Sequence, residues 1–212
     1  MQEVKPSKPE PHGLCPSDHL RLTAGPVSAV FDDGFLRYIR LGSAEIVRGL
    51  YSAVRDHNWD TIPGRIRDFR MERGSDSFTL RYVSEHRRGS IGFTWNAEIT
   101  GAPDGTVTYS MDGTVLSTFR KNRIGFCLLH PMSLAGLPCR VTHSDGSRED
   151  GSFPALISPH QPFLDMKRIE YEVLGVRVSQ DFEGEVFEME DQRNWTDASY
   201  KTYCTPLGLP FP

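Results

Sequence analysis

The residues best suited to chemistry are concentrated in one stretch near the end of the sequence. The segment Glu185–Cys204 (EVFEMEDQRNWTDASYKTYC) combines carboxylates, an arginine, amides and an indole within twenty residues. Carboxylates can act as general bases, a guanidinium can stabilise an oxyanion, and aromatic rings pack on the C–H faces of sugars. The segment therefore favours a site for a polyhydroxylated ligand. The alternative is a charged sheet face followed by an ion-paired surface loop.

These side chains need a strand and a loop to position them. Val186–Glu190 alternates apolar and charged residues, which predicts a strand with Glu188 and Glu190 on one face. Asp191–Asp197 contains turn-forming residues without an apolar period and predicts a loop. We expect the closing edge of a sheet to present this group of side chains at its tip.

A second loop offers similar chemistry. Asp56–Thr61 is polar and contains His57 and Trp59, while Arg123 begins a later alternating run. Indole, imidazole and guanidinium groups are the kinds of side chain that contact sugar rings and hydroxyls. The ordinary alternative for a single Trp is packing in the core.

Other reaction classes find little support. The G-x-S-x-G motif of serine hydrolases, the P-loop and the dinucleotide fingerprint do not occur. Cys127 and His130 have the spacing of two metal ligands, but on a strand they would point to opposite faces. We therefore expect no metal site and no cofactor.

Composition limits the cellular setting. The 212 residues carry 24 Lys and Arg against 28 Asp and Glu, a net charge of −4, with no basic stripe for nucleic acid. No run approaches the roughly 18 apolar residues that span a bilayer. Four scattered cysteines are typical of free thiols in a reducing compartment. We expect a cytoplasmic protein without nucleic-acid or membrane partners.

The remaining pattern predicts an all-β fold. Phe78–Tyr82, Ile91–Ile99 and Val107–Met111 alternate with a period of two, and Asp104-Gly105 marks a hairpin turn between the last two. About twelve strands, antiparallel and with little helix, indicate a large two-sheet sandwich. His143–Ser152 is expected to be a long exposed loop.

The expected domain boundaries follow composition. Residues 1–18 are rich in proline and lysine and predict a disordered leader, and residues 19–204 carry the strand pattern of the sandwich. Residues 205–212 (TPLGLPFP) predict a linker toward a further domain.

Two motifs resemble a known bacterial family. Arg123–Pro131 (RIGFCLLHP) and Glu188–Tyr203 (EMEDQRNWTDASYKTY) look like the N-terminal domain of the D-apionate lactonase family. The resemblance implies a supersandwich similar to that of galactose mutarotases, followed by a TIM-barrel domain. It also implies hydrolysis of D-apionolactone to D-apionate, a step of apiose breakdown, but carries over no catalytic residues.

Three functions fit these expectations: a lactonase domain, a non-catalytic carbohydrate-binding module that packs on the barrel, and a mutarotase-like aldose epimerase. The epimerase would pair His57 or His130 with Glu190. For the lactonase we expect a base, an oxyanion-stabilising arginine, ligand contacts and a spare acid/base. The candidate base is Glu190 or Asp191, and the candidate oxyanion-stabilising residue is Arg193 or Arg123. The candidate ligand contacts are Asn194, Trp195, Asp197, His57, Trp59 and Arg123. His130 is the spare acid/base.

Overall fold

The protein is built almost entirely of antiparallel strands. The computed structural model describes residues 19–204, so the expected leader (1–18) and linker (205–212) lie outside the described residues. The strands are β1 (Leu20–Ala24), β2 (Val27–Asp32), β3 (Phe35–Leu41), β4 (Ala44–Asp56), β5 (Gly64–Arg73), β6 (Phe78–Arg88), β7 (Ile91–Gly101), β8 (Val107–Val115), β9 (Lys121–Pro131), β10 (Pro138–His143), β11 (Arg148–Ser152), β12 (Met166–Val173), β13 (Val176–Asp181), β14 (Phe187–Asp191) and β15 (Ser199–Cys204). Two single-turn 3-10 helices, η1 (Met132–Leu134) and η2 (Gln192–Trp195), join them. The predicted all-β sandwich is confirmed, with fifteen described strands in place of about twelve.

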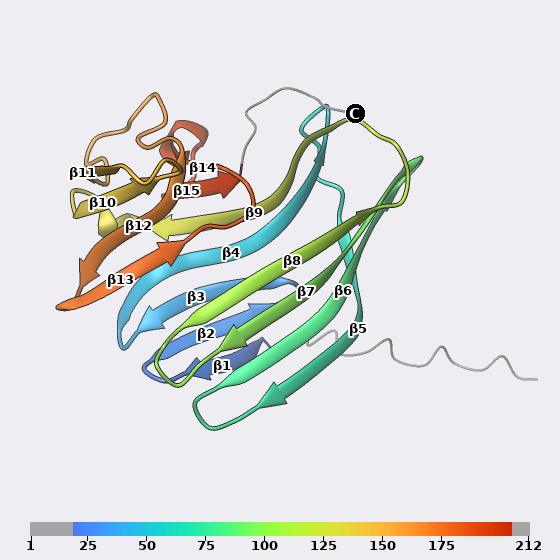
Figure 1. Ribbon diagram of the computed structural model, residues 1–212, viewed down its shortest axis with the longest axis horizontal. Helices are drawn as coiled ribbons and strands as arrows, with labels where there is room; N and C mark the ends of the chain where they lie inside the picture. The colour runs from blue at the N-terminus through green and yellow to red at the C-terminus, as the bar shows by residue number, and fades with distance from the viewer. Residues whose placement is uncertain (1–18, 205–212) are drawn as a thin grey trace, which may run out of the picture.

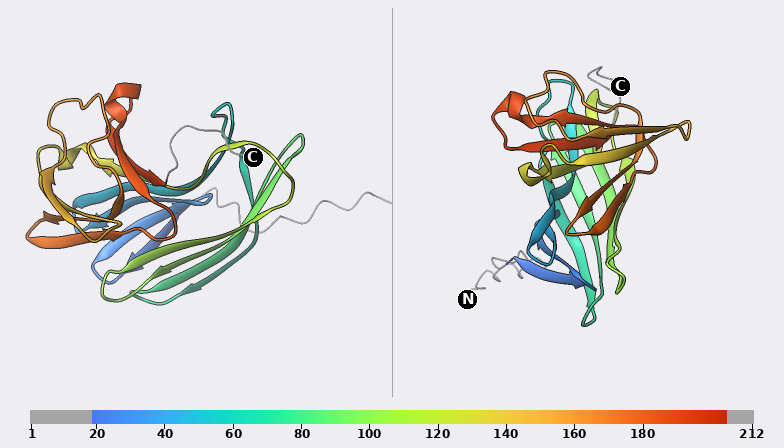
Figure 2. Two further views of the ribbon diagram at one scale, coloured as in Figure 1. Left: turned by 45° about the horizontal axis from the view of Figure 1, so that its top comes forward. Right: turned by 90° about the vertical axis from the view of Figure 1, so that its left-hand side faces the viewer.

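Two sheets form the sandwich. The large sheet has the order β1-β2-β3-β4-β9-β15-β14-β12-β10-β11, with β13 also paired to β12, and the small sheet has the order β5-β6-β7-β8. The chain leaves the large sheet after β4, builds the small sheet as three hairpins, and returns as β9 beside β4. In Figures 1 and 2 the small sheet lies across the part of the large sheet formed by β1–β4, and β10–β15 lie to one side.

Aromatic residues from both sheets fill the space between them. Phe31 of β2 packs on Tyr82 of β6 with ring centroids 5.7 Å apart, and Tyr109 of β8 meets Phe126 of β9 at 4.9 Å. Each of these large rings removes apolar surface from water, which is the main force that holds the sheets together. At one end of the sandwich the β1–β2 turn touches the β7–β8 turn. Gly25 has a φ of 51°, and a Cβ there would lie 2.0 Å from the carbonyl oxygen of Pro103, so only glycine fits this approach.

The same apolar core continues among β9, β12 and β15. The ring of Phe153, which is fully buried, lies 5.4 Å from those of Tyr171 and Tyr200 and 5.5 Å from that of His130. The Tyr171 hydroxyl donates a hydrogen bond of 2.9 Å to the Ile46 carbonyl oxygen of β4. The far strands of the large sheet are thus fixed to its centre by packing and by a long-range hydrogen bond.

Two local predictions are wrong. Within the expected loop at His143–Ser152, residues Arg148–Ser152 form the edge strand β11, paired with β10 across a turn at Asp145-Gly146. An edge strand pairs on one side only and keeps its charged side chains in water, which is why its composition is that of a loop. The expected closing edge at β14 is also wrong, because β14 lies inside the large sheet between β15 and β12. Its neighbour β15, buried along its whole length, was not predicted as a strand.

Candidate functional site

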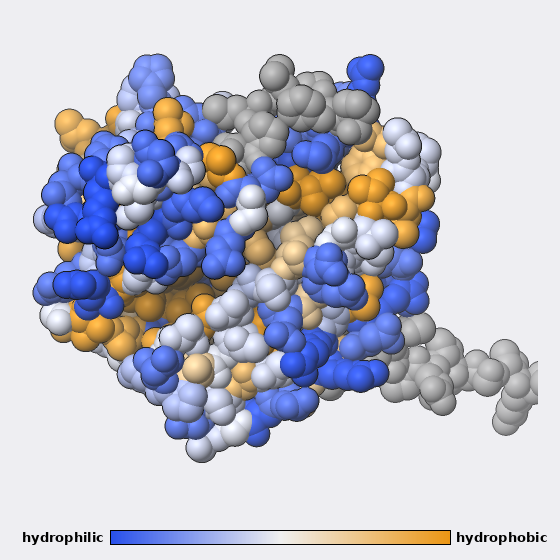
Figure 3. All heavy atoms as spheres, viewed as in Figure 1, coloured by the Kyte–Doolittle hydropathy of each residue, from blue (hydrophilic) through white to orange (hydrophobic). Residues whose placement is uncertain are grey.

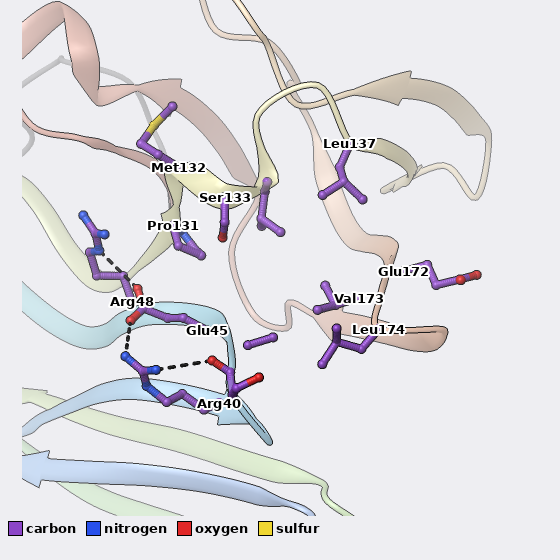
Figure 4. A pocket seen from close by; sticks show the side chains of 13 residues that line it. Arg40, Glu45, Arg48, Pro131, Met132, Ser133, Leu137, Glu172, Val173 and Leu174 are labelled. Carbon is purple, nitrogen blue, oxygen red and sulfur yellow. Dashed lines mark hydrogen bonds and ion pairs between the residues drawn. The ribbon is translucent and has the colours of Figure 1, made fainter.

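One hollow of the described surface lies away from the predicted site residues. It is open to solvent, has a volume of about 550 Å³, and lies between the β3–β4 hairpin, η1 and the β12–β13 turn (Figure 4). Arg40 and Arg48 both bind Glu45 on one side, and Val173 and Leu174 lie on the other. The two guanidinium groups share one carboxylate in partly exposed ion pairs, and none of the predicted site residues lines this hollow.

A polar face on four adjacent strands is a better candidate. In β4, β9, β15 and β14, paired in that order, alternate side chains share one face of the sheet. One cross-strand row contains Tyr51, Cys127, Tyr203 and Glu188. Rows on either side add further charged residues. We define the outer-face cluster as these residues: Tyr51, Arg55, Arg123, Cys127, Glu188, Glu190, Lys201 and Tyr203.

Glu190 lies at the centre of a small hydrogen-bonded group. Its carboxylate accepts from Trp195 Nε1 at 2.5 Å and from Gln192 Nε2 at 2.8 Å. Lys201 Nζ lies 3.7 Å from the same carboxylate and donates to Gln192 Oε1 at 3.3 Å. The indole of Trp195 remains 68% exposed, so it does not fill the interior. Glu190 and Trp195 are therefore brought together at a surface that a ligand can reach.

Arg123 and Glu188 meet around the ring of Tyr203. The Arg123 guanidinium lies 3.6 Å from the centroid of this ring and 5.4 Å from that of Trp59. The Tyr203 hydroxyl donates to the Glu188 carboxylate. Arg123 is only 5% exposed and Glu188 only 3%. The cluster therefore places a cation, a carboxylate and two aromatic rings in one region of low water content.

Burial shifts the pKa values of Glu188 and Lys201 in the direction that favours their uncharged forms. It raises the pKa of Glu188, against the opposing effects of the Tyr203 hydrogen bond and of Arg123. It lowers the pKa of Lys201, although Cys127 and Glu190 act in the other direction. Both shifts have the same cause, because burial in this part of the sheet disfavours the charged form of each group.

Asp191 and Arg193 lie elsewhere and are already fully engaged. Asp191 is fully buried, and its carboxylate accepts from Arg193 Nε at 2.9 Å, Arg193 Nη2 at 2.7 Å and the Ser158 amide at 2.9 Å. The other donors of Arg193 bind the carbonyl oxygens of Pro154, Ala155 and Leu156. Burial alone would raise the pKa of Asp191, but these hydrogen bonds outweigh it and lower the pKa. The pair ties the segment before β12 to η2, and its geometry is that of a structural anchor.

His130 lies in the interior. It neighbours Leu129, the partner of Lys201, along β9, so its side chain points to the opposite face of the sheet from Lys201 and Glu190. It is fully buried, with its Nε2 atom 2.8 Å from Thr202 Oγ1. Burial lowers the pKa of His130 to about 3. His130 and Glu190 therefore cannot flank one sugar, and the structure does not favour this pair for an epimerase.

His130 should make the fold sensitive to acid. Because its folded pKa of about 3 lies below the ordinary value of 6.5, the unfolded chain binds a proton more readily between these values, and stability is lost as the pH falls below 6.5. At pH 5 this residue should cost about 2 kcal/mol of unfolding free energy. Urea titrations at pH 7 and pH 5 measure the loss. His130→Gln should flatten the pH dependence and exposed His160→Gln should not; equal pH slopes in all three proteins would contradict the assignment.

The other predicted contacts are divided between the two loops. Asn194 donates to the carbonyl oxygens of Ser158 and Asp191, so it supports the anchor. Asp197 accepts from the Ser199 hydroxyl at 3.0 Å and is exposed. His57 is exposed in the turn after β4, beside Trp59. Among residues 19–204 no three metal-ligating side chains converge, and no helix there is long and apolar enough to cross a membrane.

Of the eight residues of the outer-face cluster, sequence reasoning gave a role only to Arg123 and Glu190. Tyr51, Arg55, Lys201 and Tyr203 were not proposed, Cys127 was weighed only as a metal ligand, and Glu188 was placed on the right strand without a role. One signal was available, because Ser199–Cys204 alternates β-branched or aromatic residues with polar ones and could have been interpreted as a strand. That interpretation would have placed Lys201 and Tyr203 on a common face.

Comparisons with known proteins show which family the chain belongs to. Residues 13–212 match the family model described as the N-terminal domain of D-apionate lactonase. The D-apionate lactonase of Brucella anthropi is 41% identical over 194 residues, which are 90% of this chain and 32% of that protein. The chain thus spans about a third of the length of the curated relative it matches. The resemblance seen in the two sequence motifs is confirmed, and the chain belongs to the family of D-apionate lactonase N-terminal domains.

Proposed function

We propose that this chain is the N-terminal part of a longer enzyme that hydrolyses D-apionolactone to D-apionate. The observation that carries the proposal is the 41% identity, over 90% of the chain, to a protein named D-apionate lactonase. The hydrolysis of a lactone needs a base for water, a cation or donor for the developing oxyanion, and contacts for the ring hydroxyls.

The outer-face cluster supports these roles better than the anchor does. Both carboxylates accept hydrogen bonds at each oxygen, but Glu190 is partly exposed whereas Asp191 is fully buried, so Glu190 is the better candidate for the base. Arg123 is the better candidate for oxyanion stabilisation, since the donors of Arg193 are bound to Asp191 and to carbonyl oxygens. Trp195 and Trp59 offer exposed indoles for C–H faces of the substrate.

A non-catalytic role for the domain is the second candidate. The chain spans only about a third of the relative, so the remainder of such a protein can carry all of the chemistry. Leu156, Ile157 and Trp195 are large apolar side chains that are mostly exposed, and Leu156 and Trp195 belong to segments joined by the anchor. A surface of this kind suits contact with an adjoining domain.

Apolar surface also gathers elsewhere, over the end of β8 and the connection to β9 (Figure 3). Val115 and Leu116 are exposed there.

The free cysteines Cys127, Cys139 and Cys204 support a reducing, cytoplasmic location for the protein.

The function is tested by turnover of D-apionolactone, followed as acid release at constant pH. We expect the full-length protein to open this lactone and to leave five-membered lactones of other sugars largely intact, because the hydroxyl pattern must match fixed donors and acceptors. The absence of D-apionolactone hydrolysis by a folded full-length protein would refute the proposal. Assay of the 212-residue chain alone then separates the two candidates, since a site contained in this domain should retain turnover.

A further inference from the structure

Two arginine side chains of the outer-face cluster have donors without acceptors. Arg55 of β4 and Arg123 of β9 are directly paired across the two strands and share a face. The Nε atom of each is buried, and neither finds a hydrogen-bond acceptor among residues 19–204. A buried guanidinium whose donors remain unpaired is unfavourable, because it has lost its water without a replacement. This part of the sheet therefore lacks an anion.

The neighbouring charges do not supply that anion. Glu190 is occupied by Lys201, Gln192 and Trp195. The hydroxyl of Tyr203 binds Glu188 and offsets part of the cost of burying this carboxylate, on which Arg123 also acts. Glu188 is the remaining carboxylate of the outer-face cluster. Two cations against one carboxylate leave an excess of one positive charge, which fits a ligand with a single negative charge.

The guanidinium group of Arg123 is held in place by the protein before any ligand binds. Its guanidinium stacks 3.6 Å from the centroid of Tyr203, and both residues are on strands in the middle of the large sheet. Stacking fixes the plane of the guanidinium and leaves its edge as the direction for hydrogen bonds. A carboxylate is the planar anion that such an edge binds best.

Trp59 adds a surface for the rest of the ligand. The residue has a φ of 70°, a strained conformation for a bulky side chain, and its indole is 43% exposed beside Arg123. The strained turn is held by Asp56, whose carboxylate accepts from the amides of Asn58 and Asp60 and from Arg88 at 2.5 Å. Backbone strain maintained by a buried carboxylate, next to unpaired cations, is typical of a binding site.

We propose that Arg55, Arg123 and Trp59 bind a sugar acid, with the carboxylate on the paired guanidinium groups and a C–H face of the carbon chain on the indole. The lactone itself has no carboxylate, so this site distinguishes the open-chain acid from the ring. The identity of the acid rests on the proposed function, under which it is the reaction product D-apionate. The guanidinium that stabilises the oxyanion during ring opening then also binds the carboxylate that results.

Calorimetric titration of the full-length protein with sodium D-apionate tests the site. Arg123→Gln and Arg55→Gln should each weaken D-apionate binding about 10- to 100-fold, since each removes charge-assisted hydrogen bonds. Binding of the neutral sugar D-apiose should change much less. Arg140→Gln, which removes an exposed arginine paired with Asp150, is the matched control and should leave both affinities unchanged.

Arg123 is buried, so its variant needs a check for folding by thermal melting. Arg55 is only partly buried, and Arg55→Gln provides the second test if Arg123→Gln does not fold. D-apionate affinity that is unchanged in the folded variants would overturn the proposal. Lactone hydrolysis, measured on the same preparations, separates the lactonase function from the sugar-acid site. If the protein turns over the lactone but its binding of D-apionate does not depend on the two arginines, the sugar-acid site alone is refuted. Arginine-dependent binding without turnover refutes the lactonase function and supports the acid site.

Discussion

Replacement of Glu190 by glutamine in the full-length protein is expected to lower kcat for D-apionolactone by about 10²- to 10⁴-fold, the usual contribution of a general base. Glutamine has nearly the same shape and can still accept from Trp195 Nε1, but it cannot take a proton from water. KM should change little, because the loss concerns the transition state more than the bound substrate. Initial rates over a range of lactone concentrations measure both constants.

The matched control is Glu98→Gln. Glu98 is an exposed carboxylate on β7 of the small sheet, where it binds Arg81 at 2.5 Å, and its loss should leave both constants unaltered. Thermal melting must show that Glu190→Gln is folded, since Lys201 loses its ionic partner. Unchanged kcat in the folded variant would remove Glu190 as the base and would favour the non-catalytic role of the domain.

Replacement of Asp191 by alanine should reduce the free energy of unfolding by about 3–5 kcal/mol, the cost of removing one partner of a buried ion pair. Asp191 has no exposed surface, and its loss would leave the Ser158 amide and the donors of Arg193 without their acceptor. The 3-10 helix η2 would lose its side-chain cap as well, since the Asp191 carboxylate accepts from the Arg193 amide. Urea unfolding followed by circular dichroism measures the change.

The exposed pair of Arg140 and Asp150 is the reference for this experiment. Its geometry is also two-pronged, with distances of 2.6 and 2.9 Å, but both side chains are largely in water. Asp150→Ala should therefore cost about 1 kcal/mol or less. If Asp191→Ala were equally mild, the anchor would not be structural, and Asp191 would return as a candidate base.

Local sequence patterns were sufficient for much of the fold. The alternating runs that became β6, β7 and β8 were identified with the turn at Asp104-Gly105 between the last two, where Gly105 has a φ of 93° and Asp104 accepts from the Thr106 amide. Such turns depend on a few adjacent residues, so the sequence displays them directly.

The site was only partly predictable for a different reason. Glu190 and Asp191 were alternatives for one role, yet the strand continues through both residues and sends them to opposite faces. The polar segment Asp191–Asp197 contains a 3-10 turn whose arginine binds inward, to Asp191 and to carbonyl oxygens, and whose indole lies outward against Glu190. Which of two neighbouring side chains meets solvent depends on what packs on each face, and no local pattern shows that.

The sequence by itself determined the class of the protein and its hairpins, because turns and period-two alternation depend on adjacent residues. It also indicated the family, because two of its motifs resemble that family. The tertiary structure decided the order of strands in the large sheet, and with it the cluster in which Arg55 meets Arg123 and Tyr203 meets Glu188. The first pair is 68 residues apart in the chain, and β15, the last described strand in the sequence, lies in the middle of the large sheet. Pairing between distant strands is selected by the packing of the whole core, and therefore only the folded chain shows which charges share a face.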